Sequence, residues 1–591
     1  MAATRENIVE EFQEFDIDLE NDEIISKLVE ISELFAFDAD SMVNEWLAYQ
    51  SRHNQTPLTI TELEQLEHEL VNTRSKSTAK TKTDHHSSNT TDAFTNISTP
   101  TDALDIMAGY CSPGNRNKLR KMNVQTPVAI TPNSKFTRMD VQSSPLFSPP
   151  SSVSKGSQKY SSRINSGEVT AQLYEGDSPN TEFWLKMTEN RCAVRLNSAS
   201  SKPQKYMFQK IMDVSDVLND NVESIAEEIQ QAHKNQIETY APCSAPCQSE
   251  VVVVGQMRSE SNTRLLPQGV VLVGDRVNSF GRSVPVDLER LSDYSLYPGQ
   301  VMAMLGTNPT GSKFIVSRIF TPTCKSGRIE VGNPKDLADD DDRLTIIAAS
   351  GPFTTSDSLS YEPLLDLISV VKQNRPDVTI IIGPLVDSKC NLIENGLIDQ
   401  AFGSLGQNWI NFICNALDGY TQTVFVPSHR DLFHHPVYPQ PPYVSRKREN
   451  VHFATNPSTF KVGDVNVGVT SADILFHLGA EEISLSQTSS SVDRLSRLTG
   501  HLLTQKSFYP LYPPHESMPF DVLAAEQGCQ LPNDVDVLLL PSDLKTFVKC
   551  LNGRVVVNPG RLAKGLSGGT YTRLVIAGTS KMRVGAEIVK I

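Results

Sequence analysis

The segment from residue 75 to residue 160 is dominated by residue types that cannot build a packed core. Ser, Thr, Pro and Gly occur there 14, 11, 7 and 3 times, and together they account for 35 of its 86 residues. A segment of this composition buries too little apolar surface to offset the entropy of ordering the chain. It therefore predicts a disordered linker over residues 76–165, between a small N-terminal unit and a much larger remainder.

The predicted linker carries six Ser-Pro or Thr-Pro pairs. One such pair is common in any linker, but a cluster is typical of regulation by proline-directed kinases. Phosphate groups would add negative charge close to the basic run Arg116–Lys121. That run is either a nuclear import signal or a plain solvated patch. The candidate phosphorylation sites are Thr99, Ser112, Thr126, Thr131, Ser144 and Ser148.

The first 75 residues show helical patterns. Apolar residues recur at helical spacing over Ile24–Phe35 and Met42–Leu47, and Thr61 with Glu64 forms a capping-box pattern. These patterns predict a small all-α domain over residues 1–75, which can bury only a modest core. The domain is either a solvated helical bundle or a docking module on a tether, and the linker that follows favours the docking module.

The remainder of the 591 residues is too long for one core, so the whole chain is expected to hold two to four domains. Short β segments separated by glycine turns predict a barrel domain with a helical insertion over residues 166–335. From residue 343 strands alternate with helices, which predicts an α/β domain over 343–591, a β-sandwich flanked by helices. The barrel segments are Val251–Val254, Val270–Val273, Val301–Leu305 and Phe314–Ile319.

The charge and the apolar runs exclude several classes of protein. A formal net charge of −15 disfavours nucleic-acid binding through the overall field, although local basic patches stay open. The longest apolar runs, such as Val251–Val254, are far shorter than the roughly 20 residues that span a bilayer. The N-terminus lacks the apolar core of a secretory signal. Nine scattered cysteines fit a reducing compartment better than a disulfide framework.

No pattern of metal ligands is complete. Cys243 and Cys247 form a close pair, but no second pair lies near them in the sequence, and a zinc site needs about four ligands. The histidines at 429, 434, 435 and 477 lack the spacing of a His-Glu-x-x-His motif. We therefore predict no cofactor.

Two strand-to-loop junctions resemble those of the calcineurin-like metallophosphoesterases. Those enzymes carry Gly-Asp-x-x-Asp after one strand and Gly-Asn-His-Asp/Glu after the next. This chain has Gly-Pro-Leu-Val-Asp after the first strand, so Pro384 replaces the bridging carboxylate while Asp387 remains. After the second strand it has Pro-Ser-His-Arg-Asp, so Ser428 replaces the Asn while His429 remains.

The other ligand positions of that resemblance are also altered. The first box of the family ends a strand with Asp-x-His, and Ala348 and Ser350 stand there in this chain. No late Gly-His-x-His box is present. A two-metal centre needs several carboxylates and imidazoles that converge on the ions. The degenerate positions Ala348, Ser350, Pro384, Asp387, Ser428 and His429 therefore predict a phosphoesterase scaffold without a catalytic site, a metal site or enzyme activity.

Longer strings make the chain similar to one family, the B subunits of the replicative DNA polymerases, and in particular to the branch that works with primase. These subunits combine an OB-fold barrel with an inactive phosphoesterase-like domain. The strings include Gly-Pro-Phe-Thr-Thr-Ser-Asp at 351–357, Tyr-Glu-Pro-Leu at 361–364, Pro-Ser-His-Arg-Asp at 427–431, His-Pro-Val-Tyr-Pro-Gln-Pro-Pro at 435–442, Phe-His-Leu-Gly-Ala-Glu-Glu at 476–482 and Tyr-Ser-Leu-Tyr-Pro-Gly-Gln at 294–300.

The resemblance implies a non-catalytic accessory subunit in the nucleus. Such a subunit holds the C-terminal zinc-bearing domain of the catalytic polymerase subunit and links it to primase for primer synthesis. Its N-terminal domain recruits other replication factors, since a flexible tether raises the effective concentration of what it carries. DNA is contacted mainly through the complex, and no membrane is involved.

Two loops rich in Tyr, Phe and Pro, residues 436–444 and 508–514, suggest where partners bind. Exposed aromatic residues suit protein interfaces because they give contact area at low entropic cost. The other interpretation is that these loops only cover the edges of a sheet. The candidate interface residues are Tyr438, Tyr443, Tyr509 and Tyr512.

Two rival functions remain. A phosphodiesterase with altered ligands could rest on Asp387, His429 and Asp473. A single-stranded DNA-binding protein could instead use the barrel, whose basic and aromatic residues are few. These residues are Arg264, Arg276, Arg282 and Phe280.

Overall fold

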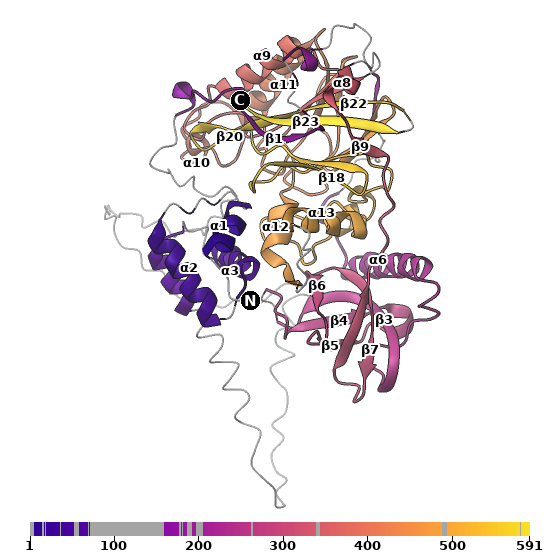
Figure 1. The fold of residues 1–591 in the computed structure, drawn as a ribbon. Coiled ribbons are helices and arrows are strands. Elements are labelled where there is room, and N and C mark those ends of the chain that lie inside the picture. Colours follow the sequence, from indigo (N-terminus) through magenta and orange to yellow (C-terminus); the bar gives the residue numbers. More distant parts are fainter. Residues whose placement is uncertain are drawn as a thin grey trace, which may run out of the picture. The chain divides into compact units, whose positions relative to one another are not determined.

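The structure is a computed structural model of the chain (Figure 1). It describes residues 5–70 apart from 15–16, 18, 20, 36, 53–57 and 69. It also describes residues 159–591 apart from 177–178, 180, 186–191, 197–204, 262–263, 339–342, 487–492 and 580. The six predicted phosphorylation sites and the basic run of the linker lie outside the described residues.

The N-terminal region is helical, as predicted. Its helices are α1 (Arg5–Glu14), α2 (Asp22–Phe35) and α3 (Ala39–Arg52), and a further helical stretch begins at Ile60. Apolar side chains at helical spacing point inward, because a helix of this length gains most of its stability from packing one apolar face. The buried residues include Phe12, Leu28, Ile31, Trp46 and Leu66.

Five strands pair into a closed barrel in the order β3-β4-β5-β8-β7. Helix α6 (Ile211–Ala232) lies beside the barrel (Figure 1). Its Val222, Ile225 and Ile229 pack against barrel residues that include Val254. The prediction of short strands between 250 and 320 is therefore confirmed. The barrel elements are β3 (Cys247–Ser259), β4 (Val270–Gly274), the short helix α7 (Arg276–Ser279), β5 (Ser283–Asp287), β7 (Val301–Asn308) and β8 (Phe314–Phe320).

One glycine lets two barrel strands cross closely. A Cβ atom at Gly255 would lie 2.2 Å from the carbonyl oxygen of Val273 in the neighbouring strand. Glycine is required where backbones approach this closely, since any side chain would force the strands apart.

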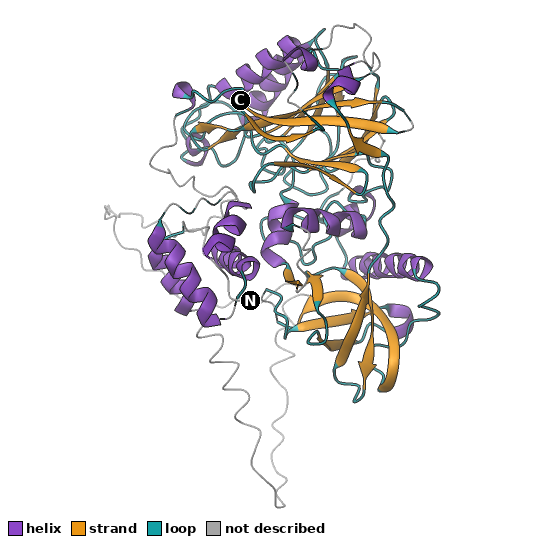
Figure 2. Cartoon of the chain, viewed as in Figure 1, coloured by secondary structure: helices purple, strands orange, loops and turns teal. Residues whose placement is uncertain are grey.

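The C-terminal region contains two sheets stacked face to face (Figure 2). The first has the order β1-β23-β22-β10-β11-β12-β13, with β9 pairing β23, and the second has the order β18-β19-β17-β15-β14-β2. The strands of the first sheet are β1 (Val169–Leu173), β9 (Ile329–Val331), β10 (Leu344–Ser350), β11 (Val378–Ile382), β12 (Gln422–Val426), β13 (Val451–Phe453), β22 (Thr570–Ala577) and β23 (Met582–Lys590). Those of the second are β2 (Val194–Leu196), β14 (Ser458–Val462), β15 (Val465–Val469), β17 (Val537–Leu539), β18 (Phe547–Leu551) and β19 (Arg554–Asn558).

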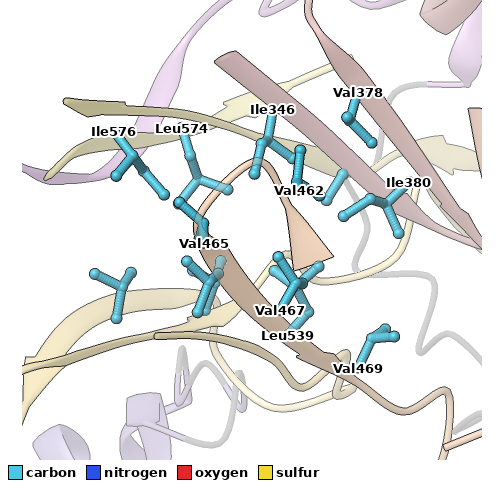
Figure 3. Packing of buried hydrophobic residues seen from close by; sticks show 14 of the residues in the cluster. Ile346, Val378, Ile380, Val462, Val465, Val467, Val469, Leu539, Leu574 and Ile576 are labelled. Atoms are coloured by element: carbon cyan, nitrogen blue, oxygen red, sulfur yellow. The ribbon is translucent and has the colours of Figure 1, made fainter. Parts of the chain in front are cut away.

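The core of this region lies between the two sheets. Figure 3 shows Ile346, Ile380 and Leu574 of the first sheet near Val467 and Leu539 of the second. The central parallel strands are continuous apolar runs in the sequence because both faces of their sheet are covered by other elements.

A second core lies on the outer face of the first sheet, under α9 (Glu362–Asn374) and α11 (Phe402–Leu417). Further elements of the region are α8 (Pro334–Ala338), α10 (Asn391–Glu394), α12 (Ile474–Glu481), α13 (Arg494–Gln505), α14 (Val522–Gly528), and the short strands β20 (Ala563–Lys564) and β21 (Ser567–Gly568).

The boundary between the barrel domain and the sandwich differs from the predicted one. Strand β1 pairs antiparallel with β23, and β2 pairs antiparallel with β14. Both β1 and β2 fall within the range 166–335 that the sequence assigned to the barrel domain. The chain thus enters the sandwich, leaves it to form the barrel, and returns at β9.

Barrel and sandwich are joined by a further strand pair. Strand β6 (Asp293–Leu296) pairs antiparallel with β16 (Ile483–Ser486). The side chain of Gln505 accepts a hydrogen bond from the Val301 N–H and donates one to its carbonyl oxygen, each at 2.9 Å. A side-chain amide used in this way satisfies the backbone of the barrel strand that faces it.

Among the described residues, no helix combines the length and the apolar character needed to cross a bilayer.

Candidate functional site

The carboxyl ends of the central strands of both sheets meet in one place. Strands β10, β11 and β12 are parallel in the first sheet, and β15, β17 and β19 are parallel in the second. The loops that follow parallel strands emerge at the same edge of a sheet, which is where ligand sites form in such folds. Arg561, after β19, donates a hydrogen bond of 3.3 Å to the hydroxyl of Ser350 at the end of β10, so the two edges touch.

Asp387 and Arg430 form a buried ion pair between the loops after β11 and β12. The Arg430 Nε donates to Asp387 Oδ1 at 3.0 Å, and its Nη2 contacts Oδ2 of the same carboxylate. Both side chains are buried. A two-point guanidinium–carboxylate pair of this kind satisfies both partners with fixed geometry. The carboxylate that the sequence analysis identified as a remaining ligand is therefore occupied by an arginine.

A second arginine holds the acidic residues at the ends of β15 and β17. The Arg561 Nε donates to Asp543 at 2.8 Å, and its Nη2 lies 3.4 Å from Asp473. Asp473 also accepts from the Ser542 hydroxyl at 2.5 Å and from the Asp543 N–H at 2.7 Å. Burial and the charge of Asp543 raise the pKa of Asp473, whereas Arg561 and Arg430 outweigh burial and lower the pKa of Asp543. Asp543 is thus the more acidic carboxylate of this pair.

Asp431 fixes the loop after β11 to the loop after β12. Its carboxylate accepts backbone N–H groups from Leu385 at 2.5 Å and Ser428 at 2.9 Å, and the hydroxyl of Tyr443 donates to it. Burial raises the pKa of Asp431 to about 6, against the effect of these donors. The carboxylate therefore serves as a fixed acceptor for the two loops.

Burial and neighbouring arginines lower the pKa values of the other basic side chains in the site. Burial, followed by the nearby charges of Arg430, Lys389 and Arg561, lowers the pKa of His429 to about 3. Burial and Arg430 lower the pKa of Lys389 to about 6. His429 is consequently neutral at pH 7. Within the described ranges, no group of three or more His, Cys, Asp and Glu side chains is placed to hold a metal ion.

The six positions singled out from the sequence lie at these strand ends. Ala348 and Ser350 are buried in β10, and Pro384 follows β11. Ser428 is buried beside Asp431, while Asp387 is engaged by the neighbouring arginine. Sequence reasoning assigned no role to the residues that dominate the cluster. The available signal was that each arginine or acidic residue stands three to five positions after the end of an apolar strand; these residues are Arg430, Asp431, Asp543 and Arg561.

The predicted aromatic interface is wrong for three of its four residues. Tyr438, Tyr443 and Tyr509 are 0%, 3% and 3% exposed, so their rings belong to the interior. The hydroxyl of Tyr438 lies 3.0 Å from the Thr470 hydroxyl, which explains how a buried tyrosine is tolerated there. Only Tyr512 is half-buried, and the guanidinium carbon of Arg258 lies 5.2 Å from the centre of its ring.

Models of three protein families match the chain. A model for the B subunit of DNA polymerases alpha and epsilon matches residues 346–549, and one for the OB domain of the DNA polymerase alpha B subunit matches residues 215–322. A third, for the N-terminal region of the DNA polymerase alpha B subunit, matches residues 6–73.

Curated relatives carry the same name. The DNA polymerase alpha B subunit of Mus musculus is 34% identical, with 100% of both chains covered. The protein of that name from Bos taurus is 33% identical over 93% of this chain and 91% of its own, and that from Schizosaccharomyces pombe is 32% identical over 63% and 68%. A solved structure of Vps29 from Chaetomium thermophilum is 10% identical and covers 42% of this chain and 97% of its own, at a TM-score of 0.20 that is too low to establish a shared fold. On full-length similarity, the chain belongs to the family of DNA polymerase alpha B subunits.

Proposed function

We propose that this chain is a non-catalytic accessory subunit that scaffolds the DNA polymerase alpha complex during primer synthesis in the nucleus. Its barrel and sandwich together hold the C-terminal zinc-bearing domain of the catalytic subunit and connect it to primase. The N-terminal domain recruits other replication factors, and DNA is reached mainly through the complex. Membership of the family supports this role.

The proposal that the chain has no enzyme activity rests on two arginines at the strand ends, Arg430 and Arg561. We infer that the sandwich is a phosphoesterase scaffold whose carboxylates neutralise guanidinium groups in place of metal ions. The ion pairs of Arg430 with Asp387 and of Arg561 with Asp543 support this inference. A two-metal reaction needs carboxylates that are free to bind cations and a water-accessible position between them.

Two experiments test the proposal. Full-length chain co-expressed with the catalytic subunit of DNA polymerase alpha and with primase should purify as a stoichiometric complex, and its loss from the complex would contradict scaffolding. The isolated chain should release no nitrophenol from bis(p-nitrophenyl) phosphate in the presence of Mn²⁺. Turnover together with stoichiometric bound manganese would instead support the residual phosphodiesterase.

Binding of single-stranded DNA by the barrel is less well supported. Phe280 is exposed, but the guanidinium of Arg276 is held by three carboxylates of α6. Arg264 donates to the backbone carbonyl of Glu482 at 3.3 Å. Salt-sensitive binding of an oligothymidine by the isolated chain would favour this alternative.

A further inference from the structure

Large apolar side chains are exposed where helix α6 begins. Phe208, Ile211 and Met212 are 78%, 87% and 71% exposed. Isolated exposed apolar residues need no explanation, but three large ones within five positions form a patch, and apolar patches mark interaction sites. Val214, Val217 and Leu218 continue the helix as its half-buried inner side. The three exposed residues thus contribute little to the packing of α6.

The same outer side of α6 continues as a row of acidic residues. Met212, Asp216, Asp220 and Glu223 follow one another at spacings of four, four and three, so they share one face of the helix. Helix α6 contains six acidic residues and no Lys or Arg between Ile211 and Ala232. The apolar patch therefore ends in a strongly acidic stripe.

One arginine of the barrel pairs with this stripe. Guanidinium nitrogens of Arg276 lie 3.4 Å from a carboxylate oxygen of Asp216 and 3.1 Å from one of Asp220. A third such contact, also of 3.1 Å, joins Arg276 to Glu223. A single positive charge against three carboxylates leaves an excess of negative charge. Two further cations lie along α6 in the part of the chain that the structure describes: Lys210 is its N-cap residue, and Lys506 pairs with Glu228 at 2.5 Å.

A second exposed apolar pair adjoins this arginine. Val277 and Phe280 are 63% and 78% exposed, in and just after the short helix α7 that carries Arg276. The acidic stripe is thus flanked by apolar side chains on both of the elements that its ion pairs join.

We propose that this surface, formed by Phe208, Ile211, Met212, the acidic stripe and Phe280, binds a Lys- and Arg-rich amphipathic helix of a partner protein. The apolar side of such a helix would cover the exposed side chains, and its basic side would neutralise the carboxylates that Arg276 leaves in excess. Amphipathic helices bind grooves through apolar anchors at helical spacing, and charge complementarity sets orientation and association rate. The proposal goes beyond the scaffolding role, because it assigns a partner of stated chemistry to one surface and does not depend on that role.

The test uses the full chain and a fluorescein-labelled 18-residue helical peptide with leucine on one side and lysine on the other, followed by fluorescence anisotropy. We expect saturable binding to wild type. The double variant Asp216→Lys with Asp220→Lys should weaken binding at least tenfold, and Asp216→Asn with Asp220→Asn should weaken it less. Phe208→Ser with Ile211→Ser should also weaken binding, at salt concentrations where charge alone no longer retains the peptide.

The matched control reverses two acids elsewhere. Glu394 and Asp399 are exposed on the sandwich beside the exposed Leu397, so Glu394→Lys with Asp399→Lys makes the same change in net charge next to an apolar residue. Equal losses in the two charge-reversed variants would overturn the proposal, because binding would then follow the overall field. Far-UV circular dichroism and thermal unfolding establish that each variant is folded.

A second copy of this chain is the alternative occupant. Sedimentation velocity distinguishes it, since wild type should be monomeric at the peptide-binding concentrations. A dimer that dissociates in the Asp216→Lys, Asp220→Lys variant would contradict a basic partner helix. Binding of an acidic control peptide as tightly as the lysine peptide would contradict it equally.

Discussion

The imidazole rings of His477 and His515 lie stacked, with their centroids 4.3 Å apart and 7° between their planes. The Nδ1 atom of His477 lies 3.0 Å from the hydroxyl of Tyr509. Burial and the neighbouring ring lower the pKa of His477 well below its ordinary range, and burial lowers the pKa of His515 to about 4. Both rings are therefore neutral in the folded protein at pH 7.

This pair predicts a pH-dependent contribution to stability. In the unfolded chain a histidine binds its proton near pH 6.5, whereas His515 binds it near pH 4 in the folded chain. The contribution of neutral His515 to the free energy of unfolding is therefore fully present above pH 6.5. It decreases by up to about 3 kcal/mol as the pH falls toward 4. Urea unfolding of wild type and His515→Phe between pH 7.5 and 4 should show the difference in unfolding free energy shrinking or reversing as the pH falls. Parallel pH profiles would contradict this assignment.

The buried ion pair of Asp387 with Arg430 leads to a second prediction, about the stability of variants that lack one or both charges. Arg430→Met leaves a buried carboxylate without its cation, which typically costs about 3–5 kcal/mol of stability. Asp387→Asn combined with Arg430→Met should recover part of that loss, because no buried charge then remains. Chemical denaturation of the two single variants and the double variant gives the coupling energy directly. Additive losses would show that the two side chains act independently.

The contacts of Glu482 predict that the stability of the barrel depends on that of the sandwich. Burial alone would raise its pKa, but Arg497 and His501 outweigh burial and hold the pKa of Glu482 well below its usual range. Arg497 donates to the carboxylate at 2.9 and 3.0 Å, and the hydroxyl of Ser295 in β6 donates to it from the barrel side.

Glu482→Gln should therefore destabilise the chain by about 1.5–3 kcal/mol, because the half-buried Arg497 loses the charge of the carboxylate that accepts two of its hydrogen bonds and keeps its 3.3 Å contact with Asp40. We expect calorimetry to show the unfolding of barrel and sandwich separating into distinct transitions. A thermogram that matches wild type in midpoint and shape would count against a joining role for Glu482.

We expect the substitution of Phe280 by glycine to stabilise the chain. Its backbone lies in the left-handed region with φ of 54°, which L-residues with a Cβ atom adopt at a cost of roughly 1–2 kcal/mol. Phe280→Gly removes this cost and sacrifices little buried surface, so the unfolding free energy should rise by about 0.5–1 kcal/mol after the greater chain entropy of glycine is counted. Phe280→Ala keeps the Cβ atom and is the control, which should gain nothing. The same glycine variant should bind the lysine-rich peptide less tightly.

Much of the local structure follows from the sequence. Apolar runs bounded by glycine and proline place strands at 378–382 and 424–426, and the structure has β11 over the first range and β12 over Gln422–Val426. The pairing of strands that lie far apart in the sequence does not follow in this way. The partner of β1 is β23, about four hundred residues away, and nothing in the local pattern of Val169–Leu173 specifies that pairing.

The candidate site shows the same limit. The sequence predicts that ligand positions are replaced, but the pairing of Arg561 with Asp543 depends on two strand ends that only the fold brings together. The tyrosine-rich loops fail for another reason. Composition predicts exposure, yet Tyr438 and Tyr509 find hydroxyl and imidazole partners inside the protein, which removes the cost of burying their polar ends.

The insertion of the barrel between strands of the sandwich has a consequence for fragments of this chain. A cut at the exposed Lys325–Ser326 bond would leave β1, β2 and β6 on one piece and their partners β23, β14 and β16 on the other. Three separate strand pairs would then bridge the nick. The two pieces, produced as separate polypeptides, should therefore find each other and reassemble by complementation, as the halves of a split reporter do.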